Sequence, residues 1–407
     1  MATERDLDLV VYGATGFVGK LTVEYLAAHA PDGVRIGLAG RSREKLERVK
    51  ADVGVDWPIV TADSQDAEAL KAMAELARVV VTTVGPYMKY GMPLVEACAT
   101  AGTHYADLTG ETLFMRETID RFHAVAEKTG ARIVHNCGFD SIPSDLGTFL
   151  LHGEAGELGD TTLVVRAMKG GPSGGTLDSM TGQIDAMRSD RSKAKVMMDP
   201  YALSPERSRE PDGKDEADLR GPKHDDELGW LAPFVMAQIN TRVVRRSNAL
   251  QEWAYGRGFR YREVMGMGDG TGGRVKATGL SLGLGALVAG MTFPLSRKAL
   301  GVVLPSPGEG PSEKARENGF FKIDIHTKTP SGERYVCHVN AKGDPGYKAT
   351  ALMLGEAGLC LALDEERMPR RAGVLTPATA MGIALVDRLR SAGMTLEVEK
   401  VAAKAAA

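Results

Sequence analysis

Short apolar runs alternate with helical stretches along about the first 150 residues of this 407-residue chain. A strand that helices cover on both faces is apolar along most of its length, so this alternation predicts a parallel sheet between two layers of helices. The strands of this sheet are expected at residues 7–12, 34–40, 58–62, 79–84, 102–111 and 132–137.

Beyond about residue 151 the pattern changes. A strand is expected at 161–167, and residues 257–265 alternate as in a strand with one solvated face. Residues 319–328 and 334–341 also alternate, on either side of a turn, and predict a hairpin. The chain is too long for one ordinary core, so we expect an α/β protein with a doubly wound parallel sheet at 1–150 and a second α+β domain, with a mainly antiparallel sheet, at 151–346.

An uncharged segment stands out within the second domain. Residues 278–296 carry no charged side chain, and Arg274 and Lys276 precede them while Arg297 and Lys298 follow. The length is close to the roughly 20 residues that span a bilayer. Its four glycines, between strand-like segments, favour a buried helix or hairpin. The alternatives are an apolar element on a membrane surface, with its flanking cations on anionic headgroups, and a complete transmembrane span.

Composition and charge exclude some classes of protein. The formal net charge is −3 and no basic stripe with interleaved aromatic residues is present, so nothing favours nucleic-acid binding. No secretory signal precedes the first strand, and the cysteines are too widely spaced for a zinc site. We therefore expect a cytoplasmic protein without a metal site, whose thiols are reduced and buried. The four cysteines are Cys98, Cys137, Cys337 and Cys360.

The first strand leads into a glycine-rich turn and then a helix, which is the context that a dinucleotide-binding sequence requires. The first glycine permits a tight turn, the second lets a pyrophosphate approach the backbone, and the third lets the helix pack closely on the strand. The helix N-terminus would face the phosphates with free N–H groups. We expect a Rossmann-type nucleotide site made of Gly13, Ala14, Thr15, Gly16, Phe17, Val18 and Gly19.

The second strand indicates which dinucleotide binds. It ends, about 20 residues past the glycines, in Arg41 and Ser42 instead of an acidic residue. An acidic side chain there would bind the ribose 2′-hydroxyl of NAD, whereas an arginine accommodates the 2′-phosphate of NADP. The sequence therefore predicts NADP(H). Asp63 is expected beside the adenine, and Gly85 and Pro86, after the fourth strand, near the nicotinamide.

Polar side chains follow the fourth, fifth and sixth strands, at the edge where a doubly wound sheet binds its ligand. Tyr87 is the first candidate for a proton donor because it follows the strand at the cofactor end. Each candidate also has a structural interpretation; Ser141 could equally be a helix N-cap. The candidates for catalysis are Tyr87, Tyr105, Asp107, Asp140 and Ser141.

Four segments of the sequence together resemble a known family. They are GATGFVG at 13–19, VGPY at 84–87, AGTHYADLTGE at 101–111 and NCGFDSIPSDLG at 136–147, and pieces at 174–176, 307–311 and 373–378 also fit. The chain resembles the saccharopine dehydrogenase-like oxidoreductases over nearly its whole length. It is most similar to the actinobacterial branch of trans-acting enoyl reductases of cell-envelope lipid synthesis.

The resemblance implies an activity and its partners. We expect an NADPH-dependent enoyl reductase that acts in trans on polyketide or fatty-acyl chains, free or bound to a carrier protein, with hydride added at Cβ and a proton at Cα. The helices within 347–407 would pack back on the first domain, and the second domain would bind substrate and form a homodimer. Peripheral contact with the inner face of the cell membrane is also expected if the uncharged segment meets lipid.

Two other functions stay open at this point. No Tyr-x-x-x-Lys pair stands where short-chain dehydrogenases carry one, which disfavours ordinary carbonyl reduction by that couple. An imine or carbonyl reductase of a small substrate would need cations for its carboxylates, and Arg166, Arg257 and Arg260 are the candidates. The third possibility is a lipid-associated or membrane-associated NADP-binding protein without turnover.

Overall fold

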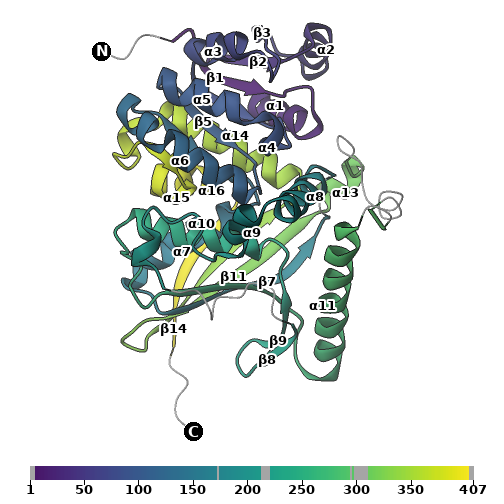
Figure 1. Ribbon diagram of the computed structural model, residues 1–407, viewed down its shortest axis with the longest axis vertical. Helices are drawn as coiled ribbons and strands as arrows, with labels where there is room; N and C mark the ends of the chain where they lie inside the picture. The colour runs from purple at the N-terminus through teal and green to yellow at the C-terminus, as the bar shows by residue number, and fades with distance from the viewer. Residues whose placement is uncertain (1–4, 172–173, 212–220, 294–295, 298–309, 403–407) are drawn as a thin grey trace.

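The structure is a computed structural model that describes residues 5–171, 174–211, 221–293, 296–297 and 310–402. Two seven-stranded sheets organise the chain. Sheet A and its helices form the upper part of the molecule in Figure 1, sheet B forms the lower part, and several helices lie between them.

Sheet A is parallel throughout, in the order β13-β6-β5-β4-β1-β2-β3. Its interior strand β1 is buried at every position, as its apolar sequence requires. The predicted doubly wound parallel sheet is confirmed, with a seventh strand, β13, that the sequence did not predict. The strands are β1 Leu7–Tyr12, β2 Ile36–Gly40, β3 Ile59–Thr61, β4 Ala77–Thr82, β5 His104–Asp107, β6 Arg132–Val134 and β13 Gly373–Leu375.

Helices cover both faces of sheet A. Helix α14 comes from late in the chain and lies directly on the sheet, because a Cβ atom at Gly358 would meet Val81 and Leu9. Helices α3, α5 and α6 build the core on the opposite face. The helices are α1 Phe17–His29, α2 Arg43–Val53, α3 Ala67–Leu76, α4 Tyr87–Tyr90, α5 Met92–Ala101, α6 Thr112–Thr129, α14 Lys348–Leu363, α15 Pro377–Ala380 and α16 Gly382–Ser391.

Sheet B has the order β14-β12-β11-β7-β10-β9-β8. Strands β7 and β10 are parallel and the other neighbours are antiparallel, which confirms a mainly antiparallel second sheet. The predicted hairpin is formed by β11 and β12, while the strands β8 and β9 and the edge strand β14 were not predicted. The strands are β7 Asp160–Lys169, β8 Lys223–Asp225, β9 Gly229–Pro233, β10 Arg260–Gly266, β11 Phe320–Lys328, β12 Arg334–Lys342 and β14 Thr395–Val401.

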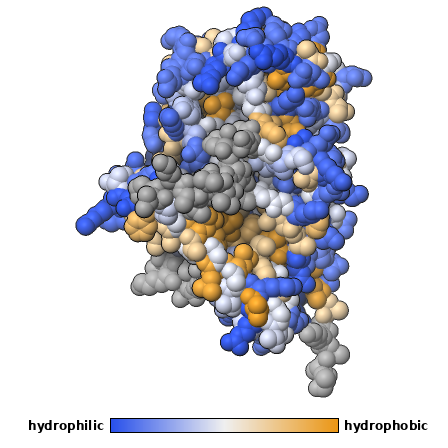
Figure 2. Space-filling view, turned by 90° about the vertical axis from the view of Figure 1, so that its right-hand side faces the viewer, coloured by the Kyte–Doolittle hydropathy of each residue, from blue (hydrophilic) through white to orange (hydrophobic). Residues whose placement is uncertain are grey.

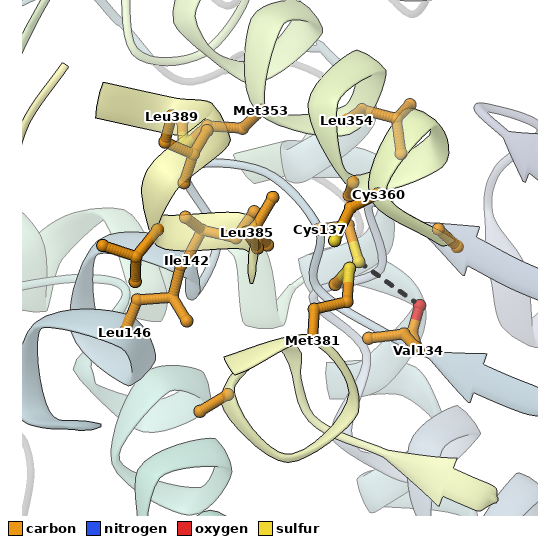
Figure 3. Packing of buried hydrophobic residues seen from close by; sticks show 14 of the residues in the cluster. Val134, Cys137, Ile142, Leu146, Met353, Leu354, Cys360, Met381, Leu385 and Leu389 are labelled. Carbon is orange, nitrogen blue, oxygen red and sulfur yellow. Dashed lines mark hydrogen bonds between the residues drawn. The ribbon is translucent and has the colours of Figure 1, made fainter. Parts of the chain in front are cut away.

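A continuous apolar core joins the two sheets. Helix α7 (Ile142–Ala155) contributes Ile142 and Leu146 to this core, and Met353 and Leu385 reach it from α14 and α16 (Figure 3). All four cysteines are free and buried, as predicted. The thiol of Cys137 lies in this core and donates to the Val134 carbonyl at 3.6 Å.

The uncharged segment forms most of helix α11, Gly270–Thr292, which stands at the right-hand side of Figure 1. Only 11% of the most apolar stretch of this helix is buried, so the favoured prediction of a buried helix or hairpin is wrong. Sequence pattern could not show this, because an apolar helix looks the same whether protein or another medium covers it. Residues 294–295 of the predicted segment, and 307–309 of the family motif, lie outside the described residues.

Candidate active site

Two of the three glycines of the nucleotide turn, Gly13 and Gly19, occupy positions where larger residues would not fit. Gly13 has φ 87°, in the left-handed region, and a Cβ atom there would lie 2.8 Å from the Thr83 hydroxyl oxygen. A Cβ atom at Gly19 would overlap the carbonyl oxygen of Gly13. The Thr83 hydroxyl also donates to that carbonyl at 3.3 Å and so ties the turn to the end of β4.

The N-terminus of α1 is open to a ligand. Gly16 is its N-cap without a side-chain hydrogen bond, no acidic residue stands in the first turn, and Thr15 and Gly16 are exposed. The first-turn N–H groups and the helix dipole therefore fit a pyrophosphate. Ala14 is buried beneath the turn, and the Phe17 ring packs edge-on against Tyr347, with centroids 5.1 Å apart. Val18 is half-buried.

The predicted adenosine-side residues gather beyond β1, β2 and β3. Arg41 is exposed just after β2, and Ser42 caps α2 by accepting from the Lys45 N–H. Burial and the charge of Asp63 raise the pKa of Tyr12 to about 12, and the charge of Arg41 opposes them. Both charged side chains therefore act on the end of β1. An exposed guanidinium here fits the 2′-phosphate of NADP.

A cavity of about 280 Å³ opens after β4, beside Pro86. Helix α4 forms one wall and helix α8 (Gly174–Ser189) the other. Its lining is Pro86, Met88, Lys89, Tyr90, Glu111, Asp178, Ser179 and Gly182. The neighbouring Gly85 is exposed. The predicted nicotinamide end of the sheet is therefore hollow enough to hold part of a substrate.

Glu111 connects the two walls of the cavity. Its carboxylate accepts from the N–H groups of Tyr87 and Met88, at 2.9 and 2.6 Å, and from the Ser179 hydroxyl at 2.6 Å. Burial raises its pKa. Glu111 was not predicted as a site residue, although it ends an unusually polar strand segment. Its partner Ser179 on α8 is 68 residues away in the chain, so the contact could not be inferred from the sequence.

Two of the predicted catalytic residues belong to a buried network. Asp107 accepts from the Tyr105 hydroxyl at 2.8 Å and hydrogen-bonds the Nδ1 atom of His135 at 2.7 Å. The Nε2 atom of His135 then meets the Thr118 hydroxyl at 2.8 Å. Tyr105 and Asp107 have no exposed surface. Their geometry is that of a satisfied internal network that joins β5, β6 and α6.

Tyr87 and Ser141 also have protein partners. The Tyr87 hydroxyl donates to the Thr82 carbonyl and accepts from the Leu108 N–H, both at 3.2 Å. Ser141 is fully buried and donates to the Asn240 side chain at 3.0 Å. Burial raises the pKa of Tyr87 far above its usual value. Its proton is therefore held in a backbone hydrogen bond.

Asp140 differs from the other four candidates. It lies in the turn after β6 and is partly exposed. Removal from water and the charge of Asp107 raise its pKa to about 7, against a hydrogen bond from its own backbone N–H that lowers it. The charge of Asp140 also acts on Tyr87, so it lies near the strand end that carries the cavity wall. Among the five candidates it is the one that both meets solvent and can exchange a proton near neutral pH.

The parallel sheet, the open glycine turn and the exposed Arg41 define a Rossmann-type NADP-binding oxidoreductase. Residues 9–134 match the NADP-binding domain of saccharopine dehydrogenase. A Mycobacterium tuberculosis protein described as a candidate trans-acting enoyl reductase is 50% identical over 98% of this chain and 99% of its own. Trans-acting enoyl reductases of Mycobacterium tuberculosis (47% identical, 97% and 98% covered) and Mycobacterium ulcerans (43%, 98% and 99%) are also similar.

This chain belongs to the trans-acting enoyl reductase branch of the saccharopine dehydrogenase-like oxidoreductases. It is an NADP-dependent enzyme, and the predicted family and cofactor are confirmed. Apo saccharopine dehydrogenase (L-Glu forming) from Saccharomyces cerevisiae has a similar fold, with a TM-score of 0.52 and 14% identity over 97% of this chain and 99% of that one. The roles of single residues stay predictions. In the part of the chain that the structure describes, no group of three histidine, cysteine or acidic residues could hold a metal.

Proposed function

We propose that this enzyme reduces the α,β double bond of an acyl thioester in polyketide or fatty-acyl lipid synthesis, on a chain that a separate synthase has made. The names of its relatives support the reaction class. The observation that carries the proposal is Asp140, a residue with some exposed surface in the turn beyond β6, whose pKa is raised to about 7 by removal of the carboxyl group from water. Reduction of an enoyl group needs a proton donor of this kind.

The residues of the chain divide the work between binding and proton transfer. NADPH, when bound on the glycine turn, supplies a hydride. Asp140, whose pKa is raised to about 7, gives its proton to Cα of the acyl group. Its partial exposure lets solvent restore the proton after each turnover. Arg41 and the N–H groups of the first turn of α1 hold the phosphates of the dinucleotide.

The cavity after β4 orients the acyl group. Met88, Tyr90 and Pro86 offer apolar surface to the chain, and Lys89 offers an ammonium group to the thioester oxygen, where negative charge develops. The same cation could bind the phosphate of a carrier-bound phosphopantetheine arm. Glu111 keeps α4 and α8 in place around this opening.

The alternative of a small substrate with two carboxylates has less support. Arg166 pairs with Asp324 at 3.3 Å, and Arg257 stacks on the Trp253 ring at 3.8 Å. Neither these two nor Arg260 lines the cavity. No specific contact therefore favours that function.

Isotope placement tests the proposal directly. The enzyme is given NADPH and a trans-2-enoyl thioester in D₂O, and the product is analysed by mass spectrometry and NMR. We expect saturation of the double bond with one deuterium at Cα and none at Cβ. Turnover of imine or keto substrates with none of any enoyl thioester would contradict the proposal.

A further inference from the structure

Helix α11 presents an apolar face to its surroundings. Val275 and Leu282 lie on one side of the helix and are 67% and 70% exposed, and Phe293, just past the helix end, is 59% exposed. We call these three residues, with the glycines and alanines between them, the α11 face. Figure 2 shows hydrophobic side chains gathered in the middle of this side of the molecule.

Exposure of the α11 face to water is energetically unfavourable. A surface helix normally has charged residues on its outer side, but α11 has none from Ala277 to Thr292. By length and composition alone, the helix is long and apolar enough to cross a membrane. A continuous exposed apolar surface of this kind marks an interaction site.

Both ends of α11 are fastened to the same folded body. At the N-terminal end, a Cβ atom at Gly273 would meet Trp230 of β9 at 3.2 Å. At the other end, Arg188 of α8 donates to the Thr292 carbonyl, and just beyond the helix Arg297 pairs with Asp185 of α8. A helix that crossed a bilayer would place its ends on opposite sides. These contacts therefore indicate a helix that lies along a surface.

The charges beside the α11 face select an anionic surface. Arg274 and Lys276 are exposed near its N-terminal end, and within the described ranges neither forms an ion pair. Arg188 lies over the Phe293 ring at the C-terminal end, 5.8 Å from its centroid. A second copy of this helix, parallel or antiparallel, would bring cations against cations. Anionic headgroups attract both ends while the acyl region accepts the apolar middle.

We propose that α11 is a membrane-surface helix that docks the enzyme on an anionic lipid bilayer. Helix α8 holds the C-terminal end of α11 and also carries Ser179 and Gly182 of the cavity wall. The bilayer contact and the cavity are thus joined by one helix. The docking itself does not depend on the proposed reaction, but delivery of an acyl chain from the bilayer to the cavity does.

Vesicle binding tests this proposal on the full chain. We expect the protein to sediment with vesicles of phosphatidylcholine mixed with phosphatidylglycerol, and much less with phosphatidylcholine alone or at high salt. Leu282→Glu should weaken binding to the mixed vesicles about tenfold or more, because it places a carboxylate in the acyl region. Lys276→Glu should weaken binding and abolish the preference for anionic lipid.

The matched control is Ile383→Glu. Ile383 is 45% exposed on α16, on the other side of the molecule from α11 in Figure 1, so the same change there should leave vesicle binding intact. NADPH binding by each variant verifies its fold. A short, water-soluble enoyl thioester separates the two proposals, since Leu282→Glu should still reduce it if the proposed reaction is right.

Three results would overturn the docking proposal. One is equal binding of the wild type and Leu282→Glu to mixed vesicles. Another is a wild-type dimer that Leu282→Glu converts to a monomer without change in vesicle binding, which would make the α11 face an interface between copies. The third is a protein that stays in membranes after carbonate extraction, as a transmembrane span would.

Discussion

Two units of this chain share one local construction. In each, a strand passes through a glycine-rich turn into a helix: β1 into α1, and β10 into α11. Gly13 and Gly268 have φ 87° and 80° in the two turns. A Cβ atom at Gly19 would overlap the carbonyl of Gly13, and one at Gly273 would overlap that of Gly268. The two turns are thus similar, although the second is one residue shorter and contains another glycine with positive φ, Gly270 at 67°.

The two units differ in what surrounds each helix N-terminus. Helix α1 begins without an acidic residue, at the edge of the parallel sheet A where several strands end together. Helix α11 has Asp269 as its N-cap and follows a strand of the mixed sheet B. A carboxylate at an N-cap repels an anionic ligand from the same N–H groups. Glycine geometry therefore makes the turn, and the neighbouring charges and strands decide whether it binds phosphate.

The largest effect is expected from Asp140, a carboxyl group that lies near the first unit and not near the second. Asp140→Asn should lower kcat for enoyl reduction by about 10²–10⁴-fold without changing NADPH affinity. Because the acid must be protonated, the wild-type rate should fall as pH rises through about 7. The variant should lack this pH dependence. Steady-state kinetics from pH 5.5 to about 9 check both statements.

The control for this change is Asp160→Asn, an exposed carboxylate at the start of β7. It should leave the kinetics unchanged. If Asp140→Asn kept the fall in rate near pH 7, the proton donor would have to be another group, and Glu111 would be the next to test.

The glycine pair gives the second largest effect. Gly19→Ala should weaken NADPH binding about 10–100-fold, because its Cβ atom displaces the turn that holds the pyrophosphate. Gly273→Ala creates the same overlap in the other unit and should lower thermal stability while leaving NADPH affinity unchanged. Fluorescence titration and thermal unfolding measure the two quantities. Equal loss of NADPH affinity in both variants would break the comparison.

Two arginines, Arg41 after β2 and Arg274 in the first turns of α11, allow a third test. Arg41→Ala should weaken NADPH binding about tenfold and leave NADH binding unaffected, because it removes a charge-assisted contact to the 2′-phosphate. Arg274→Ala, beside the second turn, should affect neither nucleotide. Competition titrations measure both affinities. If Arg41→Ala weakened NADPH and NADH binding equally, the predicted contact of Arg41 with the 2′-phosphate would be wrong.

The smallest effect is expected at Asp269. Asp269→Ser removes the carboxylate from the N-terminus of α11 and keeps a residue that caps helices well. The free energy of unfolding should change by no more than about 0.5 kcal/mol, since the side chain is exposed and makes no cap hydrogen bond. No second nucleotide should bind. Calorimetry checks this. Two NADPH sites per chain in the variant would mean that the Asp269 carboxylate alone had prevented nucleotide binding at α11.

Much of the fold followed from local patterns. The strands of sheet A and the hairpin β11–β12 were predicted close to their observed positions, because apolar runs and alternation report burial directly. The strands β8, β9, β13 and β14 were not predicted. Strand β8 lies in a stretch dense in charged residues, and β13 and β14 are held by partners far away in the chain, β6 and β12. Pairing of this kind leaves little signal in the local sequence.

The sequence by itself determined the nucleotide turn and the preference for NADP, because both depend on residue types at fixed spacing along a strand, turn and helix. Tertiary structure alone showed which of the predicted catalytic residues have protein partners, and their roles stay predictions. Asp107, Ser141 and Tyr87 found partners in His135, Asn240 and the Leu108 N–H, whereas Asp140 kept contact with solvent. Tertiary structure also decided that α11 is exposed. Burial and hydrogen bonding depend on segments that meet only when the chain is folded, so no local pattern could reveal them.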